Sequence, residues 1–368
     1  MSEKPPFIPG KILAEGFYHD EVQPVLKTHF SNLRYSAALV GSGSEVLGFD
    51  TEMSADHHWG PRVMLFLEPD AYENMRDRIR DVLGQKLPTI YRGYSTNFSE
   101  PDPDDNGTQT LQPIASNPVN HRVETFTVAG FFGDYMNVNI QDRLEPIDWL
   151  TIPQQKLRSI TAGKVFYDDL GLKDIIKRFS WYPHDVWLYI LAATWTRIGQ
   201  EEHLMGRAGF IGDEIGSSII TSRLARDIMR LVFYMEKEYP PYAKWFGTAF
   251  FGLKSAGKLK TALSGMLKAG SWEEREGYFC SAGTALVEMH NGLGITAPVP
   301  AEASPFWSRP FKVIQGDKIA AVIIDKITDP QIIPLTKPSL IGSIDIFSDN
   351  TDLLADVSFR TKIRKLYE

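Results

Sequence analysis

The spacing of apolar positions changes along the chain and separates a mixed first part from a helical second part. Residues 18–33 carry apolar side chains at helical spacing and predict one amphipathic helix with a buried stripe of Val22, Val25, Leu26, Phe30 and Leu33. Shorter patterns predict the other elements of this part: strands at residues 36–40, 63–68, 87–91 and 122–128, and a polar helix at residues 70–83. Residues 95–120 are rich in Asn, Asp, Pro, Ser and Thr, so we expect a surface loop there.

From residue 181 onward the period is that of helices. The pattern predicts helices at residues 186–198, 213–237, 258–269 and 272–291, and two more in the tail at residues 315–326 and 350–367. Asn350 or Thr351 is the expected N-cap of the last helix.

These elements predict an α+β fold, in which a mixed sheet with flanking helices is followed by a mostly helical domain. The expected boundaries are residues 1–155 for the α/β domain, 156–300 for the helical domain and 301–368 for a C-terminal extension. We expect this extension to be helical and to pack on the preceding domains. A chain of 368 residues is long enough for two domains.

Composition narrows the class of protein. The net charge of −7 argues against a general nucleic-acid binder, which would usually be basic. The single cysteine, Cys280, excludes an intramolecular disulfide and a cysteine-built metal site, and it fits a reducing compartment. The first residues do not have the pattern of a signal peptide, and no apolar run approaches the ~18 residues that a membrane span needs. We therefore expect a cytoplasmic protein that has no membrane partner.

The candidate chemistry lies between the first two predicted strands of the α/β domain. A loop with Gly41, Ser42, Gly43, Ser44 and Gly48 follows the first strand. An acidic and histidine-bearing turn at residues 56–58 then leads into the second strand. Backbone N–H groups and small hydroxyls can approach a triphosphate closely, and acidic side chains beside them can hold the Mg²⁺ that accompanies it.

Two spacings in this window resemble the polymerase β-type nucleotidyltransferase superfamily. The first is Gly43-Ser44-x-x-x-Gly48, and the second is Ser54-x-Asp56-x-His58 at the start of the next strand. More narrowly, the segment at residues 54–62, Ser-x-Asp-His-x-Trp-Gly-Pro-Arg, is similar to a bacterial family of nucleotidyltransferase-like proteins without established function. The similarity to that family extends to motifs at residues 182–187, 206–209, 212–217 and 241–247.

The resemblance implies a metal-dependent transfer of a nucleoside monophosphate from an NTP to a hydroxyl or phosphate of a small molecule or protein. In that chemistry acidic side chains hold Mg²⁺ or Mn²⁺ ions, which organise the triphosphate and activate the acceptor. By analogy, Gly43 and Ser44 bind the NTP, and Asp56 is a catalytic metal ligand. Glu124, in the strand predicted at residues 122–128, is the expected third carboxylate, and the alternative that it is an ordinary exposed strand residue stays open.

The chain departs from the superfamily pattern at the second metal position, which holds His58 in place of a carboxylate. Imidazole shifts metal preference away from Mg²⁺ toward softer ions. Three interpretations follow: the enzyme uses such an ion, Asp50 supplies the missing oxygen, or the site is degenerate. In the third case the protein is a nucleotide-binding or scaffold module without transfer activity.

Several cationic side chains are candidates for binding phosphate or an acidic substrate. Arg62 ends the motif described above, and Arg207 lies further along the chain. Arg223 belongs to a helical stripe that also contains Arg226 and Arg230. Such stripes are usually solvated or paired, and that alternative stays open. Lys244 lies among aromatic residues, which suits either a phosphate contact or a cation–π contact.

A metal-dependent phosphoesterase is a less favoured interpretation of the tripeptide Asp56-His57-His58. Such a site needs further Asp and His ligands, and the remaining histidines of the central region form no recognisable cluster. The acceptor, the preferred base of the NTP and the general base stay open. The oligomeric state stays open as well, a homo-oligomer included.

Overall fold

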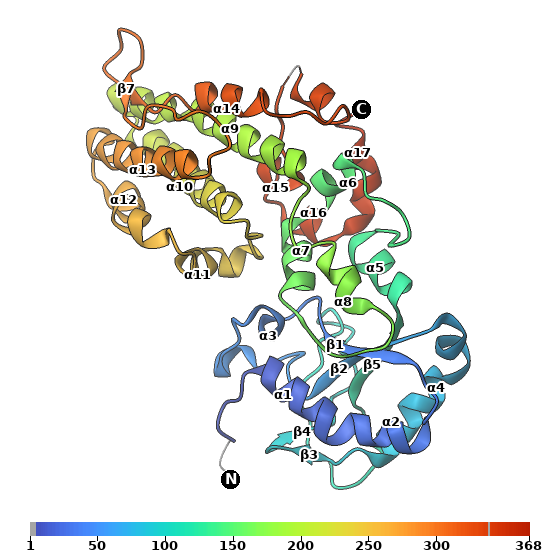
Figure 1. Ribbon diagram of the computed structural model, residues 1–368. Coiled ribbons are helices and arrows are strands. Elements are labelled where there is room, and N and C mark those ends of the chain that lie inside the picture. The colour runs from blue at the N-terminus through green and yellow to red at the C-terminus, as the bar shows by residue number, and fades with distance from the viewer. Residues whose placement is uncertain (1–4, 338) are drawn as a thin grey trace. The chain divides into compact units, whose positions relative to one another are not determined.

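The computed structural model describes residues 5–337 and 339–368. The chain divides into two compact units. The first consists of Met1–Arg143 and Lys156–Ser180, and the second of Leu144–Gln155 and Trp181–Glu368. Figure 1 shows the elements of both, and each unit is described by itself below.

A four-stranded sheet forms the centre of the first unit. Its strands are β1 (Tyr35–Leu39), β2 (Arg62–Leu67), β5 (Arg122–Thr127) and β6 (Lys164–Asp168). They lie in the order β5-β2-β1-β6, with β1 antiparallel to both neighbours and β5 parallel to β2. The parallel register places Arg62 opposite Arg122. This mixed sheet, followed by largely helical chain, confirms the predicted α+β class, although β6 was not among the predicted strands.

Helices and a small hairpin surround this sheet. They are α1 (Gly10–Phe17), α2 (Gln23–His29), α3 (Ser44–Leu47), α4 (Pro69–Lys86), α5 (Val128–Met136), α7 (Gln154–Thr161), α8 (Leu172–Lys177) and the hairpin of β3 (Ile90–Tyr91) and β4 (Tyr94–Ser95). A turn of π-helix, Tyr18–Val22, joins α1 to α2, so the helix predicted at residues 18–33 begins earlier than expected and ends earlier too. Buried apolar side chains of α1, α4 and the strands, among them Leu13, Phe17, Leu65 and Ile79, form the core.

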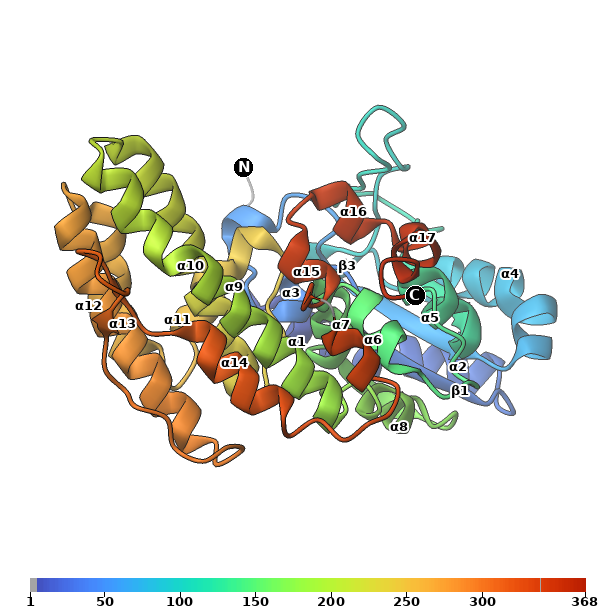
Figure 2. The same cartoon turned by 90° about the horizontal axis from the view of Figure 1, so that it is seen from above.

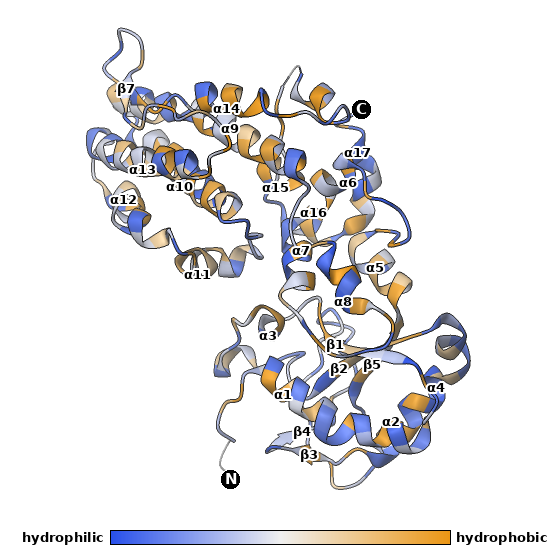
Figure 3. Ribbon diagram, in the orientation of Figure 1, coloured by the Kyte–Doolittle hydropathy of each residue, from blue (hydrophilic) through white to orange (hydrophobic). Residues whose placement is uncertain are grey.

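Long helices dominate the second unit. These are α9 (His184–Phe210), α10 (Glu214–Met235), α12 (Ala256–Lys268), α13 (Trp272–Gly292) and α14 (Gly316–Ile324), with a short α11 (Phe246–Phe251) between α10 and α12. The helices predicted at residues 186–198, 213–237, 258–269, 272–291 and 315–326 are confirmed, and Figure 3 shows the bands of hydrophobic and hydrophilic residues that alternate along them. Figures 1 and 2 both show α14 beside α9.

Local capping explains where two of these helices begin. The side chain of Asp213 accepts a hydrogen bond from the Gly216 N–H at 2.8 Å at the start of α10. Ser271 does the same for the Glu274 N–H at the start of α13. Side-chain caps of this kind satisfy N–H groups that have no partner within the helix.

The end of the chain is more broken than predicted. One helix was expected at residues 350–367, but the structure has α16 (Thr351–Ala355), a 3-10 turn at Val357–Phe359 and α17 (Arg360–Arg364). Asp356 has extended backbone angles and interrupts the helix, and its side chain caps the turn that follows. The prediction of one continuous helix was therefore wrong, while Asn350 is confirmed as the N-cap of its first turn.

Shorter elements complete the second unit: α6 (Pro146–Thr151), β7 (Ser304–Pro305), β8 (Lys312–Val313), a 3-10 turn at Ile333–Thr336 and α15 (Ile344–Phe347). Arg364 of α17 forms ion pairs with Asp148 of α6 and with Glu145. In the ranges 5–337 and 339–368, none of the helices is both long and apolar enough to cross a membrane.

Candidate functional site

The Gly-Ser turn directly follows the buried strand β1. Gly41 and Gly43 have φ angles of 84° and 148°, which side chains rarely allow. A Cβ atom on Gly43 would lie 2.5 Å from Nη2 of Arg62, so this position also needs glycine for space. The Gly41 N–H donates to the Ser159 carbonyl at 3.0 Å, and this bond fixes the entrance of the turn.

A buried ion pair between Arg62 and Glu45 stabilises this turn. Nε of Arg62 donates to Oε1 of Glu45 at 2.7 Å, and Nη2 of Arg62 donates to the Ser42 carbonyl at 2.8 Å. Both charged side chains are less than a tenth exposed. Arg62, predicted to bind the nucleotide, therefore neutralises Glu45 and holds the turn. Glu45 was missed from the sequence, although its place directly after Gly43-Ser44 was a signal.

The turn presents donors that the protein itself does not use. The backbone N–H groups of Gly43 and Ser44 have no acceptor within residues 5–337 and 339–368, and α3 begins at Ser44. Ser42 is exposed, with its hydroxyl 3.2 Å from the Tyr135 hydroxyl. Adjacent backbone N–H groups and hydroxyls at a tight turn form a concave site that suits the oxygens of an anion.

Asp50 has a structural role in this unit. Its Oδ2 atom accepts hydrogen bonds from the Gly10 N–H at 2.6 Å and from the Trp59 indole at 3.0 Å. Trp59 is almost completely buried, and Gly10 is the first residue of α1. The carboxylate thus joins α1 to the loop that carries Asp56 and His58.

The acidic and histidine-bearing turn precedes β2. Oδ1 of Asp56 lies 2.6 Å from Nδ1 of His57, and more than half of each side chain is exposed. His58 has a positive φ angle of 52°, and its N–H donates to the Gln109 carbonyl at 2.7 Å. Nδ1 of His58 lies 2.9 Å from Nη1 of Arg122.

Arg122 determines the state of this histidine. Burial, together with the neighbouring Arg122 guanidinium, lowers the pKa of His58 below its usual value. A guanidinium can only donate hydrogen bonds, so the 2.9 Å contact makes Nδ1 of His58 the acceptor and the imidazole neutral. The lone pair of Nδ1, which a metal ion would need, is therefore directed at the guanidinium of Arg122.

The same guanidinium also approaches Glu124. Nη2 of Arg122 lies 3.5 Å from Oε2 of Glu124, whose side chain is 42% exposed. Glu124 lies opposite Met64 in the parallel pairing of β5 with β2. Arg122 was missed from the sequence. Its position two residues before Glu124, on the same face of an alternating strand, was the available signal.

The structure does not assemble the predicted metal ligands into a recognisable metal centre. Over the described ranges 5–337 and 339–368 it contains no group of three or more His, Cys, Asp or Glu residues placed to hold a metal ion. Arg122 lies between His58 and Glu124, and Asp50 is bonded to Gly10 and Trp59. These contacts do not fit a divalent ion, and metal binding by Asp56, His58, Asp50 and Glu124 stays a prediction.

The remaining predicted cations belong to the second unit. Arg207 is exposed on α9, and Arg223 of α10 forms an ion pair with Glu201. Nζ of Lys244 lies 5.2 Å from the ring centroid of Trp245, which is the cation–π contact that was one of its two predicted roles. Phosphate binding by these three residues stays a prediction.

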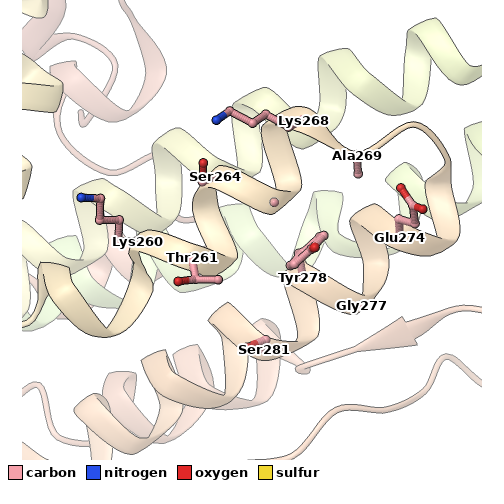
Figure 4. A pocket seen from close by; sticks show the side chains of 10 residues that line it. Lys260, Thr261, Ser264, Lys268, Ala269, Glu274, Gly277, Tyr278 and Ser281 are labelled. Atoms are coloured by element: carbon pink, nitrogen blue, oxygen red, sulfur yellow. The ribbon is translucent and has the colours of Figure 1, made fainter.

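The second unit also contains a wide groove of about 910 Å³ between α12 and α13. Figure 4 shows Lys260 and Lys268 along one side of it and Glu274 and Tyr278 on the other. None of the residues predicted from the sequence lines this groove.

Comparison with known protein families gives one finding. Residues 149–246 match a family described as "Domain of unknown function (DUF4037)". The matched stretch runs from the end of α6 into α11 and includes α9 and α10. No curated protein and no solved structure matches the chain.

Proposed function

We propose that the first unit is a nucleotidyltransferase-type module that binds a nucleoside triphosphate at the turn of residues 41–44 and has lost, or nearly lost, the transfer reaction. The observation that carries this proposal is the hydrogen bond between Arg122 and His58, because it places a cation at the second predicted metal position. The proposal corresponds to the third interpretation of the sequence, in which the metal site is degenerate and the protein binds a nucleotide without transferring it.

Three features support the binding of phosphate at this turn. The unused N–H groups of Gly43 and Ser44 are donors for phosphate oxygens. The buried pair of Glu45 and Arg62 keeps the turn in one conformation before a ligand arrives, which lowers the entropy lost on binding. Arg122 begins β5, opposite Arg62 in the pairing of β5 with β2, and adds a guanidinium that can pair with phosphate.

The contacts of the predicted metal ligands support the proposed loss of the nucleotidyl-transfer reaction. Nucleotidyl transfer needs carboxylates free to hold two divalent ions on the triphosphate. In this chain a neutral histidine replaces one carboxylate, and the carboxylate of Asp50 bonds to a buried indole and to the start of α1. A guanidinium can neutralise phosphate charge as a fixed cation, but it does not activate an acceptor hydroxyl.

The test is thermal unfolding of the full chain with each NTP, with and without Mg²⁺ or Mn²⁺, together with an assay for released pyrophosphate. A ligand at about 100 times its Kd adds roughly 2.7 kcal/mol to the free energy of unfolding, which raises Tm by a few degrees. We expect such a shift in the wild type without added metal and without pyrophosphate release. Arg122→Gln should reduce the shift, and Lys258→Gln, which alters an exposed lysine of the second unit, should leave it unchanged. Absence of any shift would overturn the proposal.

Active nucleotidyl transfer remains a second candidate, favoured by the exposure of Asp56 and Glu124, whose side chains are 66% and 42% exposed. If the wild type releases pyrophosphate with Mg²⁺ or Mn²⁺ and Asp56→Ala abolishes the release, this candidate replaces the degenerate one. If only His58→Asp releases pyrophosphate, the degenerate interpretation holds, and the substitution identifies the position responsible.

A further inference from the structure

A second candidate site is a cavity of about 390 Å³ that lies entirely within the second unit. Its wall is made by α10, by residues 240–246 after that helix and by the segment that carries α15 and α16. Gln154 and Gln155, the first two residues of α7, also line it, and they belong to the second unit although the rest of α7 belongs to the first. Small-molecule sites in proteins commonly have volumes of a few hundred cubic ångströms. Two arginines of the helical stripe seen in the sequence, Arg226 and Arg230, line it.

Arg230 is the unusual residue of this cavity. It is 91% buried, since only 9% of its surface is exposed, and it forms no hydrogen bond with any residue in the ranges 5–337 and 339–368. The nearest carboxylate oxygen, Oδ1 of Asp227, is 4.0 Å from its Nη1 atom. A guanidinium has five N–H donors, and those of Arg230 have no acceptor among the described residues. A planar anion in the cavity would supply two acceptors at once.

The neighbouring carboxylates form hydrogen bonds with other groups and none with Arg230. Oδ2 of Asp227 accepts a hydrogen bond from Nε of Arg197 at 2.6 Å. Arg226 pairs through Nη1 with Oδ2 of Asp349 at 2.5 Å, while its Nε is buried without a hydrogen-bond partner. Apart from Asp345, which is considered next, the guanidiniums of Arg197, Arg226 and Arg230 are matched only by the carboxylates of Asp227 and Asp349.

Asp345 is the remaining acidic group at the cavity. Its carboxyl oxygens accept hydrogen bonds from the Gln154 N–H at 3.2 and 3.1 Å, and it is not in ion-pair contact with Arg230. Burial raises the pKa of Asp345 to about 6. Below about pH 6 this carboxyl is protonated, so it does not cancel the charge of Arg230 and its O–H can donate to an anion in the cavity. Above about pH 6 it is ionised and can only accept hydrogen bonds.

The other side of the cavity is apolar. Pro240 and Pro241 follow α10 after a short connection and lead into Tyr242 and Phe246, and Leu354 of the C-terminal segment lines the cavity as well. Proline rings and aromatic rings offer flat hydrocarbon surfaces without charge. A ligand that fits both sides therefore has one anionic end and an apolar body.

We propose that this cavity binds a small organic carboxylate, whose carboxylate group pairs with Arg230 and whose hydrocarbon body lies against Pro241, Tyr242 and Phe246. One guanidinium with a planar fork of donors favours a planar monoanion over a phosphate ester, which carries more charge. This site uses no residue of the turn at residues 41–44, so it is independent of the nucleotide proposal.

The test is ligand-observed NMR on the full chain with benzoate, phenylacetate and hexanoate. The matched neutral probes are the three corresponding amides, and phenyl phosphate is the competing class of anion. We expect at least one carboxylate to bind at millimolar concentration and its amide to bind at least tenfold more weakly. Failure of all three carboxylates, or equal binding of acid and amide, would overturn the proposal. Stronger binding of phenyl phosphate would overturn the carboxylate assignment.

Two variants locate the binding. Arg230→Gln should weaken carboxylate binding tenfold or more, because it removes the paired donors and the charge. Ala243→Trp places an indole at the exposed rim and should reduce binding of every probe without altering Arg230. Lys258→Gln removes an exposed positive charge on α12 outside the cavity and is the matched control. Unchanged binding in Ala243→Trp would place the ligand elsewhere, and circular dichroism checks that each variant is folded.

Discussion

Arg62 donates from Nε to Oε1 of Glu45 at 2.7 Å, and this buried contact connects the start of β2 to the turn that follows β1. The same guanidinium reaches the Ser42 carbonyl. The turn proposed to bind phosphate is thus held in place by a charge pair that the ligand does not need to touch.

Glu45→Ala should destabilise the protein by about 3–5 kcal/mol, because it leaves the Arg62 guanidinium buried without its counterion. Urea unfolding followed by circular dichroism measures this loss. The double variant Glu45→Leu/Arg62→Met should cost clearly less than the sum of its two single substitutions, since it removes both charges together. Additive costs would mean that the two side chains do not interact in solution.

Gly43→Ala should destabilise the protein by more than Gly48→Ala. Both glycines have positive φ angles, but a Cβ on Gly43 meets Arg62 and Glu45, while a Cβ on Gly48 has nothing within 4 Å. The strain of the backbone alone costs about 1 kcal/mol, and the contact with the ion pair adds to it. Parallel urea titrations of the two variants compare these costs directly, and equal losses would show that the ion pair moves freely to make room.

Asp50→Asn should destabilise the metal-free protein by about 1–3 kcal/mol, because the charged acceptor for the Trp59 indole and the Gly10 N–H is lost. The emission of the buried Trp59 should change as well, although the other tryptophans contribute to the spectrum. Unfolding is measured in the presence of EDTA. If Asp50 acted only as a metal ligand, the substitution would have no effect under these conditions.

Asp345→Asn should remove a pH dependence of stability. The pKa of Asp345 is raised from 3.8 to about 6 in the folded protein, so the folded state holds a proton that the unfolded state releases between these values. The contribution is therefore fully present below about pH 4 and is lost as the pH rises through about 6, a change on the order of 3 kcal/mol.

The measurement for this prediction is the difference in the free energy of unfolding between wild type and Asp345→Asn across that range. Other acidic groups titrate in both proteins, and their effects cancel in the difference. We expect the wild type to lose stability relative to the variant as the pH rises. A constant difference would mean that Asp345 titrates near its ordinary value.

Local patterns were enough to predict the long helices and three strands of the sheet, whereas most of the short helices, such as α5, α7 and α8, were not predicted. The apolar period predicted α9, α10, α12 and α13 because each buries a long stripe along its own length. The strand β6 was not predicted, because residues 164–168 are a strand only through pairing with β1, more than a hundred residues earlier. The single helix expected near the end of the chain failed at Asp356, whose side chain caps a new turn.

The candidate site was also predicted only as far as it depends on residues that are close together in the sequence. The spacing of Gly43, Ser44, Asp56 and His58 is local, so the sequence placed them in one window. The contact between His58 and Arg122 depends on the parallel register of β2 and β5, which no local spacing reveals. Asp50 was predicted to bind a metal because its type fits, while its hydrogen bonds to Gly10 and Trp59 come from the packing of α1.

The sheet of the first unit has a consequence for synthesis on the ribosome. Strand β1 is made early, but its second neighbour, β6, ends only at residue 168, after the chain has supplied residues 144–155 to the other unit. Until β6 emerges, one edge of β1 has open N–H and C=O groups, which can pair with other chains. A fragment that stops at residue 143 would keep this edge permanently. Expression of the first unit alone therefore requires a design that restores β6, for example by circular permutation.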